Sequence, residues 1–101
     1  MGEFRLSPEA EAELDGIWIH IARESGSLDV ATRVVESIVE RFWLLARNPY
    51  IGRRRDEDLH PGLRSFTVGD YVIIHRIVED DAVLILHVVH GNREIAALFG
   101  Q

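Results

Sequence analysis

Arginine and histidine are the residues of this 101-residue chain that could act on a phosphate group. Arg64, His90 and Arg93 all fall in the second half of the sequence. Cleavage of RNA through its 2′-hydroxyl needs a general base, a general acid and cations for the charge that develops on phosphorus. These three residues could form such a site. The competing interpretation, which we favour, is that histidines on apolar strands pack in the core or at an interface.

Composition limits the other kinds of chemistry. The chain has no cysteine, so disulfides and thiolate metal sites are excluded. Its five histidines are scattered without close spacing, and we expect neither a metal nor a cofactor. A net charge of −6 argues against generic nucleic-acid binding, although all 11 basic residues are arginines and several cluster in the second half. No signal peptide or apolar run of ~20 residues is present, which predicts a cytoplasmic protein without membrane association.

The first half of the chain predicts a short strand followed by two helices. Phe4–Leu6 is apolar and alternating, and Ser7-Pro8 then forms an N-cap with proline in the first helical turn. That helix ends at Ser25-Gly26, and a second helix is expected from about Asp29 to Arg47. The short connection makes the two helices an antiparallel hairpin.

The second half predicts three strands, Leu63–Val68, Tyr71–Val78 and Val83–His90, with a two-residue turn at Gly69-Asp70. We therefore expect one α+β domain over residues 1–101, in which the helical hairpin packs on a mainly antiparallel sheet of three or four strands. The loop between helices and sheet carries Arg53-Arg54-Arg55 followed by Asp56-Glu57-Asp58. It is either a solvated turn or a basic edge that faces a partner.

Strand alternation gives the sheet two apolar faces. With a two-residue turn, one face carries Arg64, Phe66, Val68, Tyr71, Ile73, His75, Ile77, Leu84, Leu86, Val88 and His90. The other carries Leu63, Ser65, Thr67, Val72, Ile74, Arg76, Val78, Val83, Ile85, His87 and Val89. One helical hairpin can cover only one face. The other is expected to bind a partner, either a different protein or a second copy of the chain, unless the segment 94–101 folds back over it.

The order and spacing of several short stretches resemble the ParE/RelE superfamily of toxins, with ParE as the closest match. They are Leu6-Ser7-Pro8-Glu9-Ala10, Leu14-Asp15-Gly16-Ile17-Trp18, Asn48-Pro49 through Gly52-Arg53, Gly62-Leu63-Arg64-Ser65-Phe66, Gly69-Asp70-Tyr71-Val72-Ile73, Arg76-Ile77 and Val88-Val89-His90-Gly91-Asn92-Arg93-Glu94-Ile95. The resemblance covers nearly the whole chain. It implies a plasmid-stabilisation type of toxin, held inactive in a hetero-oligomer with a ParD-like antitoxin.

Within the superfamily, the resemblance leaves two targets. RelE-like toxins cleave messenger RNA on the ribosome, and Arg64 and Arg93 fall where they keep phosphate-binding arginines. Their tyrosine six residues after the second arginine is replaced here by Phe99, which has no proton to exchange. We therefore expect inhibition of DNA gyrase without catalysis by the toxin. The alternatives are a RelE-like endonuclease that uses Arg64, His90 and Arg93, or a non-toxic module that only binds antitoxin.

The resemblance and the face assignment together give two sets of binding candidates. The expected target contacts are Arg93, Phe99 and Arg64. The expected antitoxin contacts lie on the uncovered sheet face and on the helix end that is apolar almost all round. They are Phe66, Tyr71, Ile73, Leu84, Leu86, Val88 and Trp43.

Overall fold

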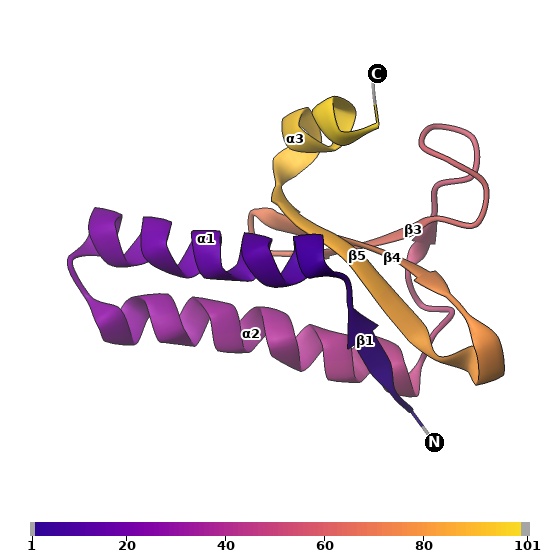
Figure 1. Cartoon of the computed structure of the whole chain (residues 1–101), viewed down its shortest axis with the longest axis horizontal. Coiled ribbons are helices and arrows are strands. Elements are labelled where there is room, and N and C mark those ends of the chain that lie inside the picture. Colours follow the sequence, from indigo (N-terminus) through magenta and orange to yellow (C-terminus); the bar gives the residue numbers. More distant parts are fainter. Residues whose placement is uncertain (1, 100–101) are drawn as a thin grey trace.

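The computed structural model describes residues 2–99, without the side chains of residues 92, 93 and 96. The elements follow one another as β1 (Phe4–Leu6), α1 (Pro8–Ser25), α2 (Leu28–Arg47), β2 (Arg53–Arg54), β3 (Arg64–Val68), β4 (Tyr71–Ile77), a 3₁₀ turn (Glu79–Asp81), β5 (Val83–His90) and α3 (Gly91–Leu98). Figure 1 shows α1 and α2 side by side as a long hairpin, with the sheet packed against one end of it.

The helical hairpin forms as its capping residues predict. The Ser7 hydroxyl accepts a hydrogen bond from the backbone N–H of Ala10, and Pro8 occupies the first turn of α1. Gly26 ends α1 in the left-handed region, with φ of 69°. Ser27 then caps α2 by accepting from Val30 N–H. Both helices bury one apolar stripe, which includes Leu14, Ile38 and Phe42 among others.

The sheet has five strands in the order β1-β5-β4-β3-β2. β1 pairs with β5 in parallel, and all other neighbours are antiparallel. The α+β class is confirmed, and so is the two-residue turn, because Val68 pairs with Tyr71. The predicted strand count was too low. Arg53 and Arg54 form a two-residue edge strand, too short to give an alternating pattern, inside the segment predicted as a loop.

A bulge in β5 overturns half of the predicted face assignment. Ile74 pairs with His87 and the next residue, His75, pairs with Ile85, so Leu86 has no partner on β4. An inserted residue of this kind reverses the alternation on one side of it. Val83 and Ile85 therefore join the core beneath the helical hairpin, while Leu86 packs in the cluster on the opposite face.

The face predicted to be uncovered is the one that the helices cover. Ile73 is 0% exposed and Val88 is 1% exposed, and both pack in the core formed with α1 and α2. The opposite face is covered at one end by α3, which the sequence analysis did not predict as a helix. Ile95 of α3 is 2% exposed and packs with Val72, Ile74 and Val89. The alternative in which the C-terminal segment folds back over the sheet is thus realised over the described part of that segment.

None of the helices in the described part of the chain combines the length and the apolar composition needed to cross a membrane.

Candidate functional site

A groove runs along the helical hairpin where it meets the sheet. It consists of two hollows of about 710 and 660 Å³, and both are lined by His20, Tyr71 and His90. The hairpin is longer than the sheet, so the end that carries Gly26 projects past the β3–β4 turn (Figure 1). The apolar inner surface of that end is therefore incompletely covered, and this overhang creates the groove.

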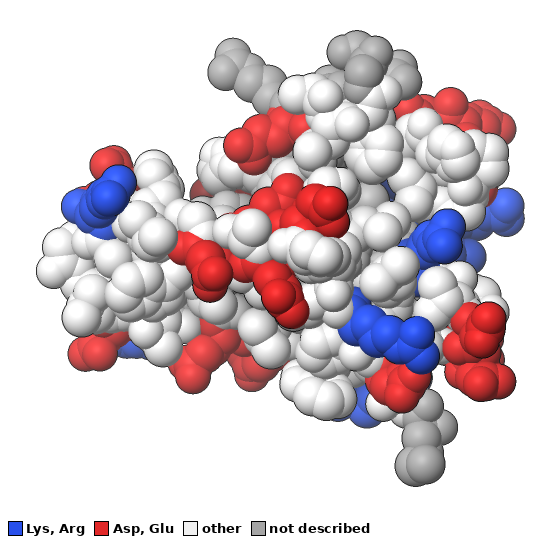
Figure 2. Space-filling model, in the orientation of Figure 1, with Lys and Arg blue, Asp and Glu red and all other residues white. Residues whose placement is uncertain are grey.

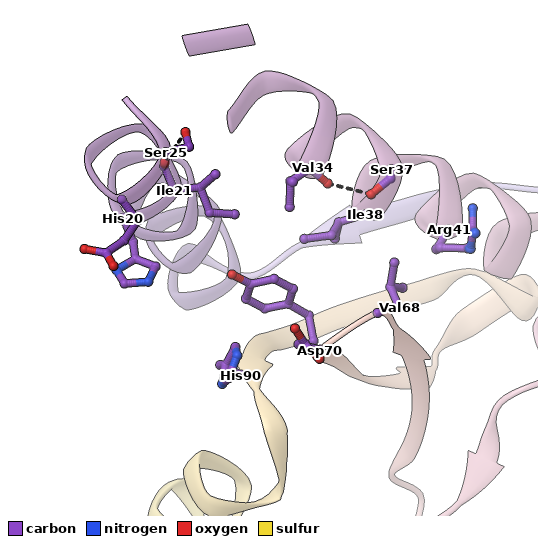
Figure 3. Close-up of a pocket in the computed structure, with 13 residues that line it drawn as sticks. His20, Ile21, Ser25, Val34, Ser37, Ile38, Arg41, Val68, Asp70 and His90 are labelled. Carbon is purple, nitrogen blue, oxygen red and sulfur yellow. Dashed lines mark hydrogen bonds between the residues drawn. The ribbon is translucent and has the colours of Figure 1, made fainter. Parts of the chain in front are cut away.

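The first hollow lies between α1, α2 and the β3–β4 turn. Figure 3 shows Ile21 from α1 and Val34 and Ile38 from α2 directed toward the space above Val68 and Asp70. Ile21 and Val34 are partly buried, and Ile38 is completely buried. The floor of the hollow is thus made of aliphatic side chains from three elements.

The second hollow continues on the other side of α1, toward α3. It is lined by Ile17 and Gly16 of α1, Val88 of β5, and Ala97 and Leu98 of α3. Leu98 is 40% exposed although it is apolar. A Cβ atom added at Gly16 would have no heavy atom within 4 Å, so the hollow is open above that residue. An apolar side chain from a partner could occupy this space without displacing any part of this protein.

Acidic side chains surround the apolar floor. The linings of the two hollows include Glu13, Glu24, Asp70 and Glu94, whereas Arg41 is the one arginine among the lining residues that the structure describes. Burial raises the pKa of Tyr71, and the charges of Asp70 and, to a smaller extent, Glu94 raise it further. Tyr71 is therefore a neutral phenol at physiological pH. The groove suits a segment that is apolar on one side and basic at its edges.

Glu13 holds α1 against the bulge in β5. Its carboxylate accepts a hydrogen bond from Val88 N–H at 2.9 Å and contacts His87 Nδ1 at 3.0 Å. The His87 ring also meets the Phe99 ring edge-on, with centroids 6.1 Å apart. These contacts connect α1, β5 and the end of α3, and thereby fix one wall of the groove. Sequence reasoning missed Glu13, because nothing local relates it to a residue 74 positions away.

Arg64 and His90 do not form a common site. Arg64 pairs across the ladder with His75, whereas His90 pairs with Tyr71 at the other end of β4. Four residues of strand separate those positions by about 13 Å. The Arg64 guanidinium donates to the backbone carbonyls of Tyr50 (3.1 Å) and Gly52 (2.9 Å).

The third residue of the predicted nuclease site, Arg93, lies on a different element. Arg93 belongs to the first turn of α3, and its side chain lies outside the described part of the structure. Groups of three or more histidine and acidic side chains that could hold a metal ion are not found among the described residues. Arg64 and His90 are thus too far apart to act on the same phosphate group.

His75, the cross-strand neighbour of Arg64, is buried in the interior of the protein. His75 is 0% exposed, and neither ring nitrogen has a hydrogen-bond partner in the described structure. Burial, and to a smaller extent the charge of Arg64, lowers the pKa of His75 to about 4 from 6.5, although the backbone of Ile73 opposes this in part. A Cβ atom at Gly52 would lie 2.7 Å from the ring, so glycine is required above it. This histidine is neutral and structural.

The residues expected to bind antitoxin do not share one surface. Tyr71 and Val88 line the groove, but Ile73 and Phe66 pack in the core beneath the helical hairpin. Two others, Leu84 and Leu86, belong to the opposite face. The remaining candidate, Trp43, is half exposed on α2, where its ring meets Phe4 edge-on at 4.7 Å. Their grouping as a single uncovered face was wrong for two reasons: the bulge moves Leu84 and Leu86 to the opposite face, and the helical hairpin covers Ile73 and Phe66. Their roles toward a partner remain predictions.

Comparison with known proteins identifies the family of this chain. The family model described as the ParE toxin of the type II toxin–antitoxin system parDE matches residues 4–95. The chain belongs to the ParE toxin family. It is 31% identical to Toxin ParE3 of Caulobacter vibrioides over 101 residues, covering all of this chain and 98% of that protein. It is 27% identical to Toxin ParE1 of Mycobacterium tuberculosis over 92 residues, covering 91% and 92% of the two chains.

Solved structures support the same family. A chain of the chromosomal ParDE system from P. aeruginosa superposes with a TM-score of 0.76 at 26% identity, covering 91% of this chain and 98% of that one. A chain of the toxin–antitoxin complex RelBE2 from Mycobacterium tuberculosis gives 0.63 at 26% identity, with coverages of 88% and 96%. The comparisons of sequence and of structure therefore agree on the toxin family and on its α+β fold.

Proposed function

We propose that this ParE-family toxin acts in the cytoplasm by inhibiting DNA gyrase, without catalysing a reaction itself, and that a ParD-like antitoxin neutralises it. The observation that favours this over RNA cleavage is the separation of Arg64 from His90 along β4. Arg64 is moreover held by two backbone carbonyls. The replacement of the expected tyrosine by Phe99 points in the same direction.

We place the antitoxin in the groove along the hairpin. An amphipathic helix buries an apolar stripe of side chains at positions i, i+3, i+4 and i+7, and such a stripe matches a groove floor of aliphatic residues. The four acids that border the floor favour a helix with lysine or arginine beside that stripe. The antitoxin segment is thus expected to be apolar and basic.

The gyrase proposal is tested with purified proteins. The chain is added to DNA gyrase, ATP and relaxed plasmid DNA, and supercoiling and cleaved plasmid are followed on gels. Inhibition of supercoiling, reversed by the cognate antitoxin, is the expected result. A parallel incubation with translating ribosomes reads messenger RNA cleavage. Cleaved messenger RNA with unimpaired gyrase would overturn the proposal in favour of a RelE-like nuclease.

The groove is tested by filling it. Gly16→Trp places an indole in the open space of the second hollow, and replacing a helical glycine does not weaken α1. We expect antitoxin affinity to fall by about a hundredfold, since several apolar contacts are blocked. The control, Gly16→Ala, adds one methyl group and should bind as the parent does. Equal antitoxin affinity of the tryptophan variant and the parent would exclude the groove as the site.

A further inference from the structure

The charged residues of the sheet are all of one sign. In the part of the chain that the structure describes, no strand contains an aspartate or a glutamate. The strands carry five arginines: Arg5, Arg53, Arg54, Arg64 and Arg76. The acids lie in the helices and turns instead. Figure 2 shows red atoms along the helical hairpin, and blue atoms next to red ones at the sheet end. The protein as a whole is acidic, so strands that contain arginines and no acids stand out from the rest of the chain.

Two of these arginines lie on one row of the sheet face that points away from the hairpin. Leu84 of β5 pairs with Arg5 of β1 on one side and with Arg76 of β4 on the other. Residues paired across neighbouring strands project from the same face, so Arg5 and Arg76 flank Leu84 at roughly 10 Å from each other. The helix α3 covers this face at the other end, over Val72 and Val89.

These two guanidinium groups are available to a partner. Arg76 is exposed and has no ion pair or hydrogen bond with another described side chain, and Arg5 has only an exposed contact with Glu3 at 3.5 Å. A hollow of about 250 Å³ lies between Arg5 and the β4–β5 turn, lined by Arg5, Val78, Glu79 and Leu84. Its apolar part can accept an aliphatic side chain, and Glu79 at its rim disfavours an acid there.

We propose that this face, defined by Arg5, Leu84 and Arg76, binds a short acidic segment of a protein partner that also carries leucine-like side chains. It goes beyond the proposed function, because it is a second surface, separate from the groove and centred on two arginines. Carboxylates of the segment pair with Arg5 and Arg76, and an aliphatic side chain enters the hollow beside Leu84. A polypeptide is favoured over nucleic acid because the chain carries a net charge of −6.

The probe is an acetylated ten-residue peptide that alternates glutamate and leucine, labelled for fluorescence anisotropy. Arg5→Gln/Arg76→Gln should weaken its binding about tenfold, since two solvent-exposed ion pairs are lost. The matched control is Arg23→Gln/Arg33→Gln, which removes the same charge from exposed positions on the helical hairpin and should bind as the parent does. Binding should also weaken when salt is raised from about 0.05 to 0.5 M.

Two further probes separate the other outcomes. A lysine–leucine peptide should be insensitive to Arg5→Gln/Arg76→Gln, because the acidic groove is its expected site. Binding of oligouridylate in preference to the acidic peptide would overturn the proposal and identify a nucleic-acid surface. An acidic peptide that does not bind the parent, or binds both double variants equally, also overturns it. None of these results depends on toxicity or on gyrase, so failure of the proposed function would be recognised separately.

Discussion

Lowering the pH should destabilise this protein through one buried side chain, His75. The ring is fully buried, and its pKa is lowered to about 4 from 6.5. Between about pH 4 and pH 6.5 the His75 ring is therefore protonated in the unfolded chain and neutral in the folded protein. Stability from this group is complete above about pH 6.5 and is lost as the pH falls toward 4.

The magnitude follows from the two pKa values. At pH 5 nearly all unfolded chains but only about a tenth of folded ones would carry the proton, which corresponds to ~2 kcal/mol. For a domain of this size that loss lowers the melting temperature by about 10 °C. The measurement is urea and thermal unfolding of the toxin alone between pH 7.5 and 5, followed by circular dichroism.

The control variant is His75→Leu, which has a similar size and cannot titrate. Exposed carboxylates such as Asp56 and Asp58, whose pKa values are lowered by a hydrogen bond from Gly62 N–H and by Arg55 respectively, lose their contribution at lower pH in both proteins. Their effect cancels in the difference between the two proteins. If His75→Leu loses as much stability as the parent between pH 7.5 and 5, the ring is not the source and the reasoning is refuted.

The remaining predictions concern packing around the site and are read from urea unfolding. Gly52→Ala should lower the free energy of unfolding by about 1–3 kcal/mol, because its Cβ would lie 2.7 Å from the His75 ring. In a chain that already carries His75→Ala, the same substitution should lower it much less, and additive effects would contradict this contact. Glu13→Ala should cost about 2 kcal/mol because it leaves Val88 N–H without its acceptor, and Glu13→Gln should cost less; equal losses would mean that the acceptor oxygen is unimportant. Ser7→Ala should cost about 1 kcal/mol through the lost N-cap, whereas no change would show that α1 begins without it.

Local signals were sufficient for much of the fold. Ser7-Pro8 and Gly26 determine where α1 begins and ends, and the turn at Gly69-Asp70 sets the register of β3 and β4. The bulge at Leu86 was not foreseeable from alternation. It lies where β5 contacts α1, and there Glu13 of the distant helix accepts the Val88 N–H. One such inserted residue was enough to exchange the faces of Val83, Leu84 and Ile85. That the helices cover the face of Ile73 is a separate fact, which alternation alone does not predict.

The candidate site could be predicted less well for the same reason. The groove arises because the hairpin extends past the sheet, which is a relation between element lengths and not a motif. Tyr71 was among the predicted contacts and does line the groove, whereas His20 showed no pattern in the sequence. The groove-lining helix α3 was missed because its short sequence, Gly91–Leu98, begins with glycine after a strand. Its stability comes from packing Ile95 on the sheet.

The central claim, a toxin that acts on gyrase and not on RNA, is tested most directly by inducing the chain alone in a bacterial host. DNA breaks and transcript integrity are measured within minutes of induction, with co-expressed antitoxin as the control. The account predicts double-strand breaks and DNA-damage signalling while messenger RNA stays intact. Cleaved transcripts with intact DNA would contradict it, and would assign the arginines and histidines of the sheet to catalysis.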